Sequence, residues 1–147
     1  MTDYVLLNQT LKALLCGNHA IADLANASAL LYSTLEQINW AGFYMLEGET
    51  LVLGPFQGKP ACIEIPMGRG VCGAAAASGR TVLVPNVHEF EGHIACDSAS
   101  NSEIVVPLFK DGRVVGVLDI DSPIYSRFDE SDRLGLEEFA AIVQERI

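Results

Sequence analysis

Apolar positions in the first forty residues recur every three or four places, which is typical of amphipathic helices. Residues 3–15 carry them at Tyr4, Leu7, Leu11, Leu14 and Leu15, and Gly17-Asn18 ends this stretch. Residues 20–37 are rich in Ala and Leu and form a second, broader apolar face that includes Ile21. We therefore expect two helices at the start of the chain.

From Ile38 the apolar positions alternate with a period of two, which is typical of strands. Residues 38–46 and 51–58 flank a polar turn and predict a β-hairpin. Asp111-Gly112 is a strong signal for a second hairpin. The six strands predicted in this part of the chain are residues 38–46, 51–58, 61–65, 81–84, 103–109 and 113–121.

Residues 130–147 again show helical spacing, with Asp129 as the expected cap and Leu134, Leu136 and Phe139 among the residues expected to face inward. Helices at both ends of a run of strands joined mainly by hairpins predict the α+β class. We expect one domain over residues 1–147, with a six-stranded antiparallel sheet flanked by N- and C-terminal helices that pack together.

Charge and hydropathy argue against several classes of function. The 147 residues contain 9 basic and 19 acidic side chains, for a net charge of −10, which argues against nucleic acid and anionic membrane surfaces as partners. The apolar runs are too interrupted for a membrane span, and Asp3 stands where a secretory signal would be basic. We expect a cytoplasmic protein.

Four cysteines, Cys16, Cys62, Cys72 and Cys96, stand far apart in the sequence. In a reducing compartment they are inert core residues, metal ligands or redox groups. No C-x-x-C pair is present to complete a structural zinc site with His88 and His93, so we expect no metal. Cys16 falls at the break between the first two helices and has no predicted role.

Cys96 lies in a polar, turn-forming run within a long loop at residues 85–101. Loops of this length in compact domains are usually functional or disordered, and rigid strands often carry reactive groups on such loops. The opposing interpretation is a small buried thiol, because free cysteines are among the most buried residue types. On this segment alone, both interpretations stay open.

A glycine-rich stretch, GRGVCG, precedes an alanine run in residues 68–80. It matches neither a Walker loop nor a dinucleotide-binding fingerprint. A helix beginning there would offer free N–H groups to a carboxylate, and its dipole would lower the pKa of Cys72.

Two further groups of side chains share one face of a predicted strand. Trp40 and Tyr44 flank Gly42 as either the wall of a pocket or ordinary core aromatics. Asp119 and Asp121 are either a pair of site carboxylates or the end of a strand that runs into solvent.

Five segments in order, NWAGFYML, LVLGPFQGKPAC, GRGVCG, VHEFEGHIACDSASNSEIVVPL and VGVLDIDSP, closely resemble the free methionine-(R)-sulfoxide reductase family, which is built on a GAF domain. The resemblance spans residues 39–128, and three cysteines stand in the family's places. It implies a single GAF domain and reduction of free L-methionine-(R)-sulfoxide to methionine, with no bound cofactor. It also implies thioredoxin as the reductant and a homodimer.

The resemblance also assigns roles. Cys96 would be the nucleophile, oxidised to a sulfenic acid; Cys62 would resolve it as a disulfide, with Cys72 as an alternative resolving or relay cysteine. Glu103, Asp119 and Asp121 would be the acids at the substrate. Trp40 and Tyr44 would hold its methyl group.

Elementary chemistry makes these implied roles reasonable. A site that selects a free amino acid needs acids for its ammonium, as Glu103, Asp119 and Asp121 supply, and N–H donors for its carboxylate, as turn amides at residues 97–100 supply. Crowded carboxylates repel, so at least one should have a raised pKa and could protonate the sulfoxide oxygen. The same charges should raise the pKa of Cys96 until the substrate ammonium binds.

GAF domains also serve as sensors of small ligands, so a ligand-binding module is the alternative function, and a redox switch without turnover is another. A sensor normally needs an output domain, for which the chain offers no room. Formation of methionine separates the enzyme from both alternatives.

Overall fold

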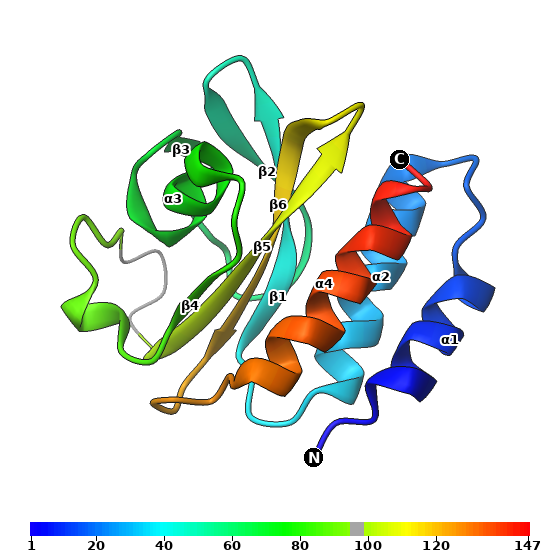
Figure 1. Cartoon of the computed structure of the whole chain (residues 1–147), viewed down its shortest axis with the longest axis horizontal. Helices are drawn as coiled ribbons and strands as arrows, with labels where there is room; N and C mark the ends of the chain where they lie inside the picture. Colours follow the sequence, from blue (N-terminus) through cyan, green and yellow to red (C-terminus); the bar gives the residue numbers. More distant parts are fainter. Residues whose placement is uncertain (95–98) are drawn as a thin grey trace.

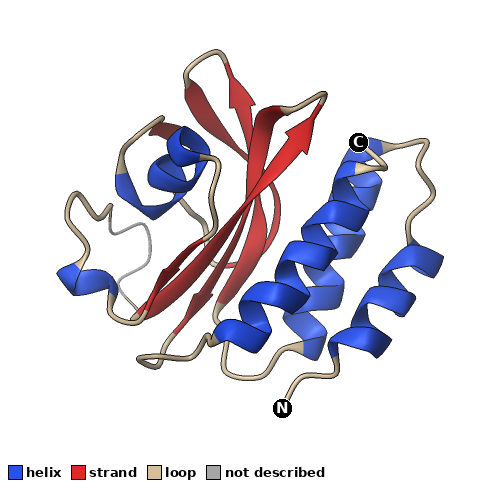
Figure 2. Ribbon diagram, viewed as in Figure 1, coloured by secondary structure: helices blue, strands red, loops and turns tan. Residues whose placement is uncertain are grey.

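The computed structural model describes residues 1–94 and 99–147. The elements follow the order expected for helices around a run of strands (Figures 1 and 2). Along the chain they are α1 (Tyr4–Leu14), α2 (Ala20–Thr34), β1 (Trp40–Glu47), β2 (Thr50–Gly58), β3 (Glu64–Pro66), α3 (Gly70–Ser78), β4 (Val82–Val84), the 3-10 turn η1 (Val87–Glu89), β5 (Ser102–Lys110), β6 (Arg113–Ser122) and α4 (Glu130–Gln144).

The strands form one antiparallel sheet in the order β3-β2-β1-β6-β5-β4. Its centre is the pair β1 and β6, which brings the two hairpins, β1–β2 and β5–β6, side by side. Asp111 and Gly112 connect β5 to β6 with φ values of 53° and 76°, as a two-residue hairpin of this twist requires. The predicted six-stranded antiparallel α+β fold is confirmed.

The helices lie on both faces of this sheet, in unequal layers (Figure 1). α2 and α4 pack directly on one face, and α1 lies outside them. The short α3 covers the opposite face. Each layer encloses its own apolar cluster, one represented by Phe43, Leu118 and Phe139, the other by Val105 and Val117.

The terminal helices pack together, as expected from their apolar faces. The Tyr4 hydroxyl donates a 2.7 Å hydrogen bond to Asp132, and the Asn8 amide donates to the Gly135 carbonyl at 3.2 Å. A Cβ at Gly135 would lie 2.2 Å from the Tyr4 ring, so glycine permits this close contact. Asp129 caps α4 through a reciprocal capping box with Asp132.

Several details differ from the sequence predictions. The third strand is β3 (Glu64–Pro66), so Cys62 precedes the strand in which it was expected. Leu134, expected to face inward, is 58% exposed, because it is two residues from the buried Leu136 and so points to the other side of α4. Ile21, in the first turn of α2, is likewise 77% exposed.

Among the helices that the structure describes, none has the length and apolar character needed to cross a membrane.

Candidate active site

The register of the central strands gathers the predicted acidic side chains on the face of the sheet that α3 covers. Asp121 of β6 lies opposite Trp40 of β1 on one side and opposite Glu103 of β5 on the other. Two residues along β6, Asp119 lies between Gly42 and Val105. Because side chains two apart on a strand point to the same face, Glu103, Asp119 and Asp121 form one group. The prediction that Asp119 and Asp121 share a face is consistent with this pairing.

Burial and mutual repulsion decide the protonation of this group. Glu103 is 7% exposed and Asp119 is 5% exposed. Burial raises the pKa of Glu103 well above its usual range, and the neighbouring Asp119 and Asp121 carboxylates raise it further. Burial also raises the pKa of Asp119, although hydrogen bonding from the Glu103 and Cys72 side chains acts in the opposite direction. The arrangement therefore holds a neutral Glu103 beside an Asp119 that is easier to ionise.

Cys72 does not have the lowered pKa that the helix terminus suggested. It is the third residue of α3 and is 4% exposed. Burial raises the pKa of Cys72 well above its usual range, and the neighbouring Asp119 and Glu103 carboxyl groups add to this rise. Desolvation and repulsion raise the pKa of Cys72 by more than the partial positive charge at the N-terminus of the short α3 lowers it. The sequence prediction was wrong, and Cys72 is a neutral thiol in contact with the acids.

The other cysteines lie in different settings. Cys16 is an exposed free thiol after α1, and its sulfur accepts a 3.4 Å hydrogen bond from the Asn18 N–H. Cys62 is half-buried and disulfide-bonded, and its carbonyl accepts a 2.8 Å hydrogen bond from the Tyr44 hydroxyl. Cys96, together with the predicted turn amides of Asp97 and Ser98, lies outside the described residues.

Aromatic side chains form the wall beside the acids. Trp40 and Tyr44 are each 2% exposed, and their ring centroids are 6.0 Å apart. Phe56 of β2 stacks on Trp40 at 5.1 Å. A Cβ at Gly42 would lie 2.3 Å from the Phe56 Cβ, so this strand position must be glycine for the stack to form. Phe56 was missed in the sequence, although alignment of the hairpin places it opposite Gly42.

These groups surround a cavity of about 40 Å³ between the sheet and α3. Its lining contains Trp40, Tyr44 and all three acids, together with three polar residues. These are Arg69, to which the sequence assigned no role, His93, which was considered only as a zinc ligand, and Ser100, at the end of the predicted turn amides. Burial lowers the pKa of His93, and the nearby His88 lowers it further. Arg69 is exposed in the turn before α3, where it can meet an anionic group of a ligand.

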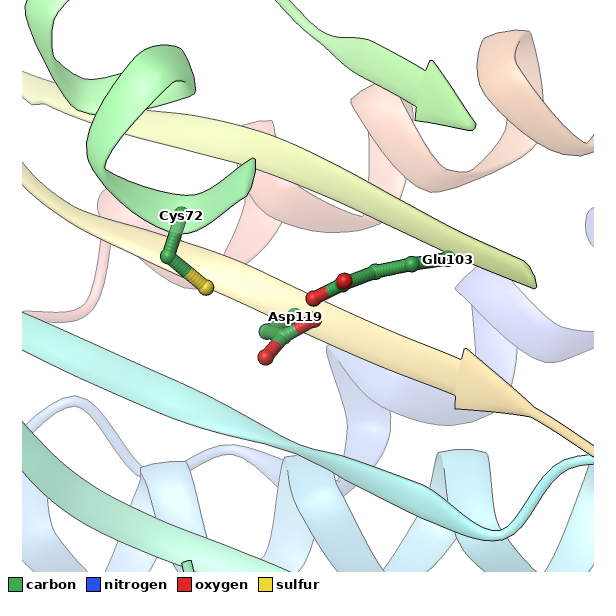
Figure 3. A group of neighbouring side chains, drawn as sticks. All are labelled: Cys72, Glu103 and Asp119. Atoms are coloured by element: carbon green, nitrogen blue, oxygen red, sulfur yellow. The ribbon is translucent and has the colours of Figure 1, made fainter. Parts of the chain in front are cut away.

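One cluster within this cavity has the donor set of a metal site. Cys72, Glu103 and Asp119 each offer one donor atom, and these atoms all lie within 4.8 Å of one another. Figure 3 shows the Cys72 sulfur, from α3, and the Glu103 carboxyl group, from β5, directed toward Asp119 of β6. The cavity as a whole therefore offers apolar rings at one side and ionisable groups at the other, which suits a small amphipathic ligand.

Comparison with known proteins agrees with this geometry. The GAF domain model matches residues 7–147. Free methionine-R-sulfoxide reductase of Escherichia coli is 56% identical over 139 residues, which cover 94% of this chain and 84% of that protein.

Solved structures show the same relationship. The fRMsr of Staphylococcus aureus in its reduced form superposes with a TM-score of 0.96 at 54% identity, covering 99% of this chain and 96% of that chain. The free methionine-R-sulfoxide reductase of Neisseria meningitidis in complex with its substrate gives a TM-score of 0.92 at 46% identity, covering 97% of this chain and 87% of that chain. With its GAF fold and these relatives, the chain belongs to the free methionine-R-sulfoxide reductase family.

Proposed function

We propose that this protein reduces free L-methionine-(R)-sulfoxide to L-methionine and that thioredoxin returns it to the reduced state. The observation that carries the proposal is the pairing, in one cavity, of buried carboxyl groups with an aromatic wall. A free amino acid with an apolar end needs both of these, and the chain is similar over nearly its whole length to reductases of that substrate.

In this proposal, recognition of the free amino acid depends on charge. Asp119 and Asp121 receive the substrate ammonium, which a methionine inside a protein chain lacks. Arg69 is near enough to the cavity to attract the substrate carboxylate. The methyl group lies against Trp40, whose ring is held by Phe56 and by a 3.1 Å hydrogen bond from its Nε1 to the Lys59 carbonyl.

Glu103 is the proposed proton donor. Its raised pKa favours the protonated form of the carboxyl group, and that proton can be donated to the sulfoxide oxygen. Protonation makes the sulfur more electrophilic at the moment of attack. A neutral Glu103 also avoids a third negative charge in the buried group.

Cys96 is the proposed nucleophile. Its sulfur attacks the sulfoxide sulfur, the oxygen passes to the cysteine as a sulfenic acid, and methionine leaves with its sulfur reduced. A second thiol then condenses with the sulfenic acid, which forms a disulfide and releases water. The two thiols of thioredoxin reduce this disulfide and become a disulfide themselves.

Cys62 is the proposed resolving cysteine, and two observations support it over Cys72. Cys62 is disulfide-bonded whereas Cys72 is a free thiol. Resolution also needs a reactive sulfur, and the raised pKa of Cys72 keeps it protonated and poorly nucleophilic. In this scheme Cys72 is a hydrogen-bonding neighbour of Asp119 and a resolving group of second choice.

The test is oxidation of NADPH coupled through thioredoxin reductase and thioredoxin. Free methionine-(R)-sulfoxide, its S epimer and a peptide-bound R-sulfoxide are compared on the native chain, Cys96→Ser and the control Cys16→Ser. We expect turnover of the free R epimer alone, abolished in Cys96→Ser and retained in Cys16→Ser. Absence of methionine formation with all three substrates would reject the enzyme in favour of a sensor or a redox switch.

A further inference from the structure

The thiol of Cys72 lies where the sheet gathers buried carboxyl groups. Cys72, Glu103 and Asp119 come from α3, β5 and β6, and their exposed fractions are 4%, 7% and 5%. One donor atom from each lies within 4.8 Å of the other two. The cluster is therefore held by three separate elements of the fold and does not depend on a single loop (Figure 3).

One atom of the cluster lacks a fixed partner. Oδ1 of Asp119 is fully buried and accepts no hydrogen bond from a backbone amide or a basic side chain in the described part of the chain. Protons on its acidic neighbours can satisfy Asp119. An ionised Asp119 has the His93 ring as a nearby basic group, and burial lowers the pKa of that ring, which disfavours its charged form. A buried carboxylate in this state favours a cation.

The donor types select the kind of cation. A tetrahedral Zn²⁺ places sulfur at about 2.3 Å and oxygen at about 2.1 Å, which separates these two ligand atoms by about 3.6 Å. Donors that already lie within 4.8 Å need to move by only about 1 Å to reach that geometry. A thiolate favours Zn²⁺ or Cd²⁺ over Mg²⁺ or Ca²⁺, which prefer oxygen alone.

We propose that Cys72, Glu103 and Asp119 form a binding site for a thiophilic divalent cation, Zn²⁺ or Cd²⁺, and that the bound cation inhibits the protein by excluding substrate. The Cys72 S–H bond is replaced by a sulfur–metal bond and the Glu103 O–H bond by an oxygen–metal bond, and both protons leave to solvent. No oxidation state changes. Three protein ligands leave a fourth tetrahedral position for water.

This site differs from the zinc site that the sequence excluded. Structural zinc sites contain closely spaced cysteine pairs, and none occurs in this chain. Here the set of ligands consists of a single thiol and two carboxyl groups from the neighbouring strands. The inhibitory part rests on the proposed function, because the cation would occupy the acids that receive the substrate ammonium.

Binding is tested without turnover on a full-length variant in which Cys72 is the sole cysteine, Cys16→Ser/Cys62→Ser/Cys96→Ser. Titration with CdCl₂ is followed by the ultraviolet charge-transfer absorption of a Cd²⁺–thiolate bond. The matched control carries Cys72→Ser in addition. Glu103→Gln and Asp119→Asn are placed separately on the Cys72-only background, and circular dichroism and thermal unfolding check each fold.

We expect one equivalent of Cd²⁺ to produce the absorption in the Cys72-only variant and none in the control. Each carboxamide substitution should weaken binding at least about tenfold, the loss of one charged ligand. Absence of the absorption in the Cys72-only variant, or an affinity unchanged by both carboxamides, would overturn the site. Both carboxamide variants keep Cys72, so the test does not depend on how one variant folds.

The proposed inhibition by the bound cation is tested separately. Free methionine, the proposed product, should weaken Cd²⁺ binding to the native reduced protein in proportion to its concentration, and ZnCl₂ should inhibit turnover competitively with the sulfoxide. Cd²⁺ affinity that is independent of methionine would overturn the competition. Cd²⁺ binding in a protein without reductase activity would leave the site intact and reject only the proposed function.

Discussion

The face of the sheet against α2 and α4 and the face under α3 are built from the same strands but have different contents. On the first face, Phe43 and Leu118 meet Phe139 in a continuous apolar cluster. On the second, Glu103 and Asp119 interrupt the apolar surface. Alternation along β5 and β6 sends successive residues to opposite faces, so one strand supplies both. The comparison indicates that the face against α2 and α4 contributes apolar burial alone, whereas the face under α3 also buries carboxyl groups, which lowers stability.

Truncation of Phe139 to alanine should give the largest loss of stability. Phe139 is fully buried in α4, and removal of a buried ring costs about 3–5 kcal/mol in the free energy of unfolding. Urea unfolding measures the loss, with Leu134→Ala on the same helix as control, where a 58% exposed side chain should change stability by no more than about 0.5 kcal/mol. Equal losses at both positions would contradict the division of roles.

Asp119→Asn, on the α3 face, should lower activity without lowering stability. Removal of the charge that we propose binds the substrate ammonium should lower kcat/KM by at least about 100-fold. Stability should be unchanged or increased, because a buried carboxyl is removed. Asp111→Asn removes the same charge from the exposed β5–β6 turn and is the control. A variant with normal kcat/KM would remove Asp119 from the substrate site.

Gly42→Ala tests the junction between the central strands and the aromatic wall. The added methyl would lie 2.3 Å from the Phe56 Cβ, so the β2 backbone must shift. We expect a loss of about 1–3 kcal/mol in stability and a higher KM, because Trp40 moves with Phe56. Gly54→Ala, whose methyl would lie 3.1 Å from the Phe43 carbonyl oxygen, should have a smaller effect. An unchanged KM in Gly42→Ala would separate the aromatic stack from substrate binding.

The pH dependence of stability should be the most gradual of these effects. The folded chain holds the Glu103 proton more tightly than the unfolded chain, because burial raises the pKa of Glu103 and the neighbouring Asp119 and Asp121 raise it further. This contribution is fully present below the unfolded pKa of glutamate and is lost as pH rises through the folded pKa, at no more than about 1.4 kcal/mol per pH unit.

Unfolding by urea between about pH 5 and pH 8 measures this dependence. Glu103→Gln should flatten it, whereas Glu64→Gln, at an exposed position of β3, should leave it as in the native chain. A native slope that persists in Glu103→Gln would show that another group holds the proton.

Local patterns were enough to predict most of the fold. The period change at Ile38 and the Asp111-Gly112 turn are properties of neighbouring residues, and both hairpins form as expected. The terminal helices follow from their apolar spacing. The prediction that Leu134 faces inward was wrong. Apolar spacing gives only the average direction of a helix's apolar face, and the edge of that face depends on which elements the helix packs against.

The site was predictable only in its individual residues. Strand periodicity grouped Asp119 with Asp121, but the pKa of Cys72 depends on how deeply α3 buries it against β5 and β6, which no local pattern contains. Phe56 was missed because its role depends on the hairpin register opposite Gly42. Arg69 and His93 reach the cavity from separate turns, so their proximity is a property of the tertiary structure.

The outermost strands of the sheet have a consequence for aggregation. β3 and β4 are only three residues long and leave most of β2 and β5 uncovered, which normally exposes backbone groups that recruit another chain. The uncovered parts contain Pro55 and Pro107, which have no N–H to donate. Strand addition is thereby disfavoured at both margins, so copies of this protein crowded together resist growth into a continuous intermolecular sheet.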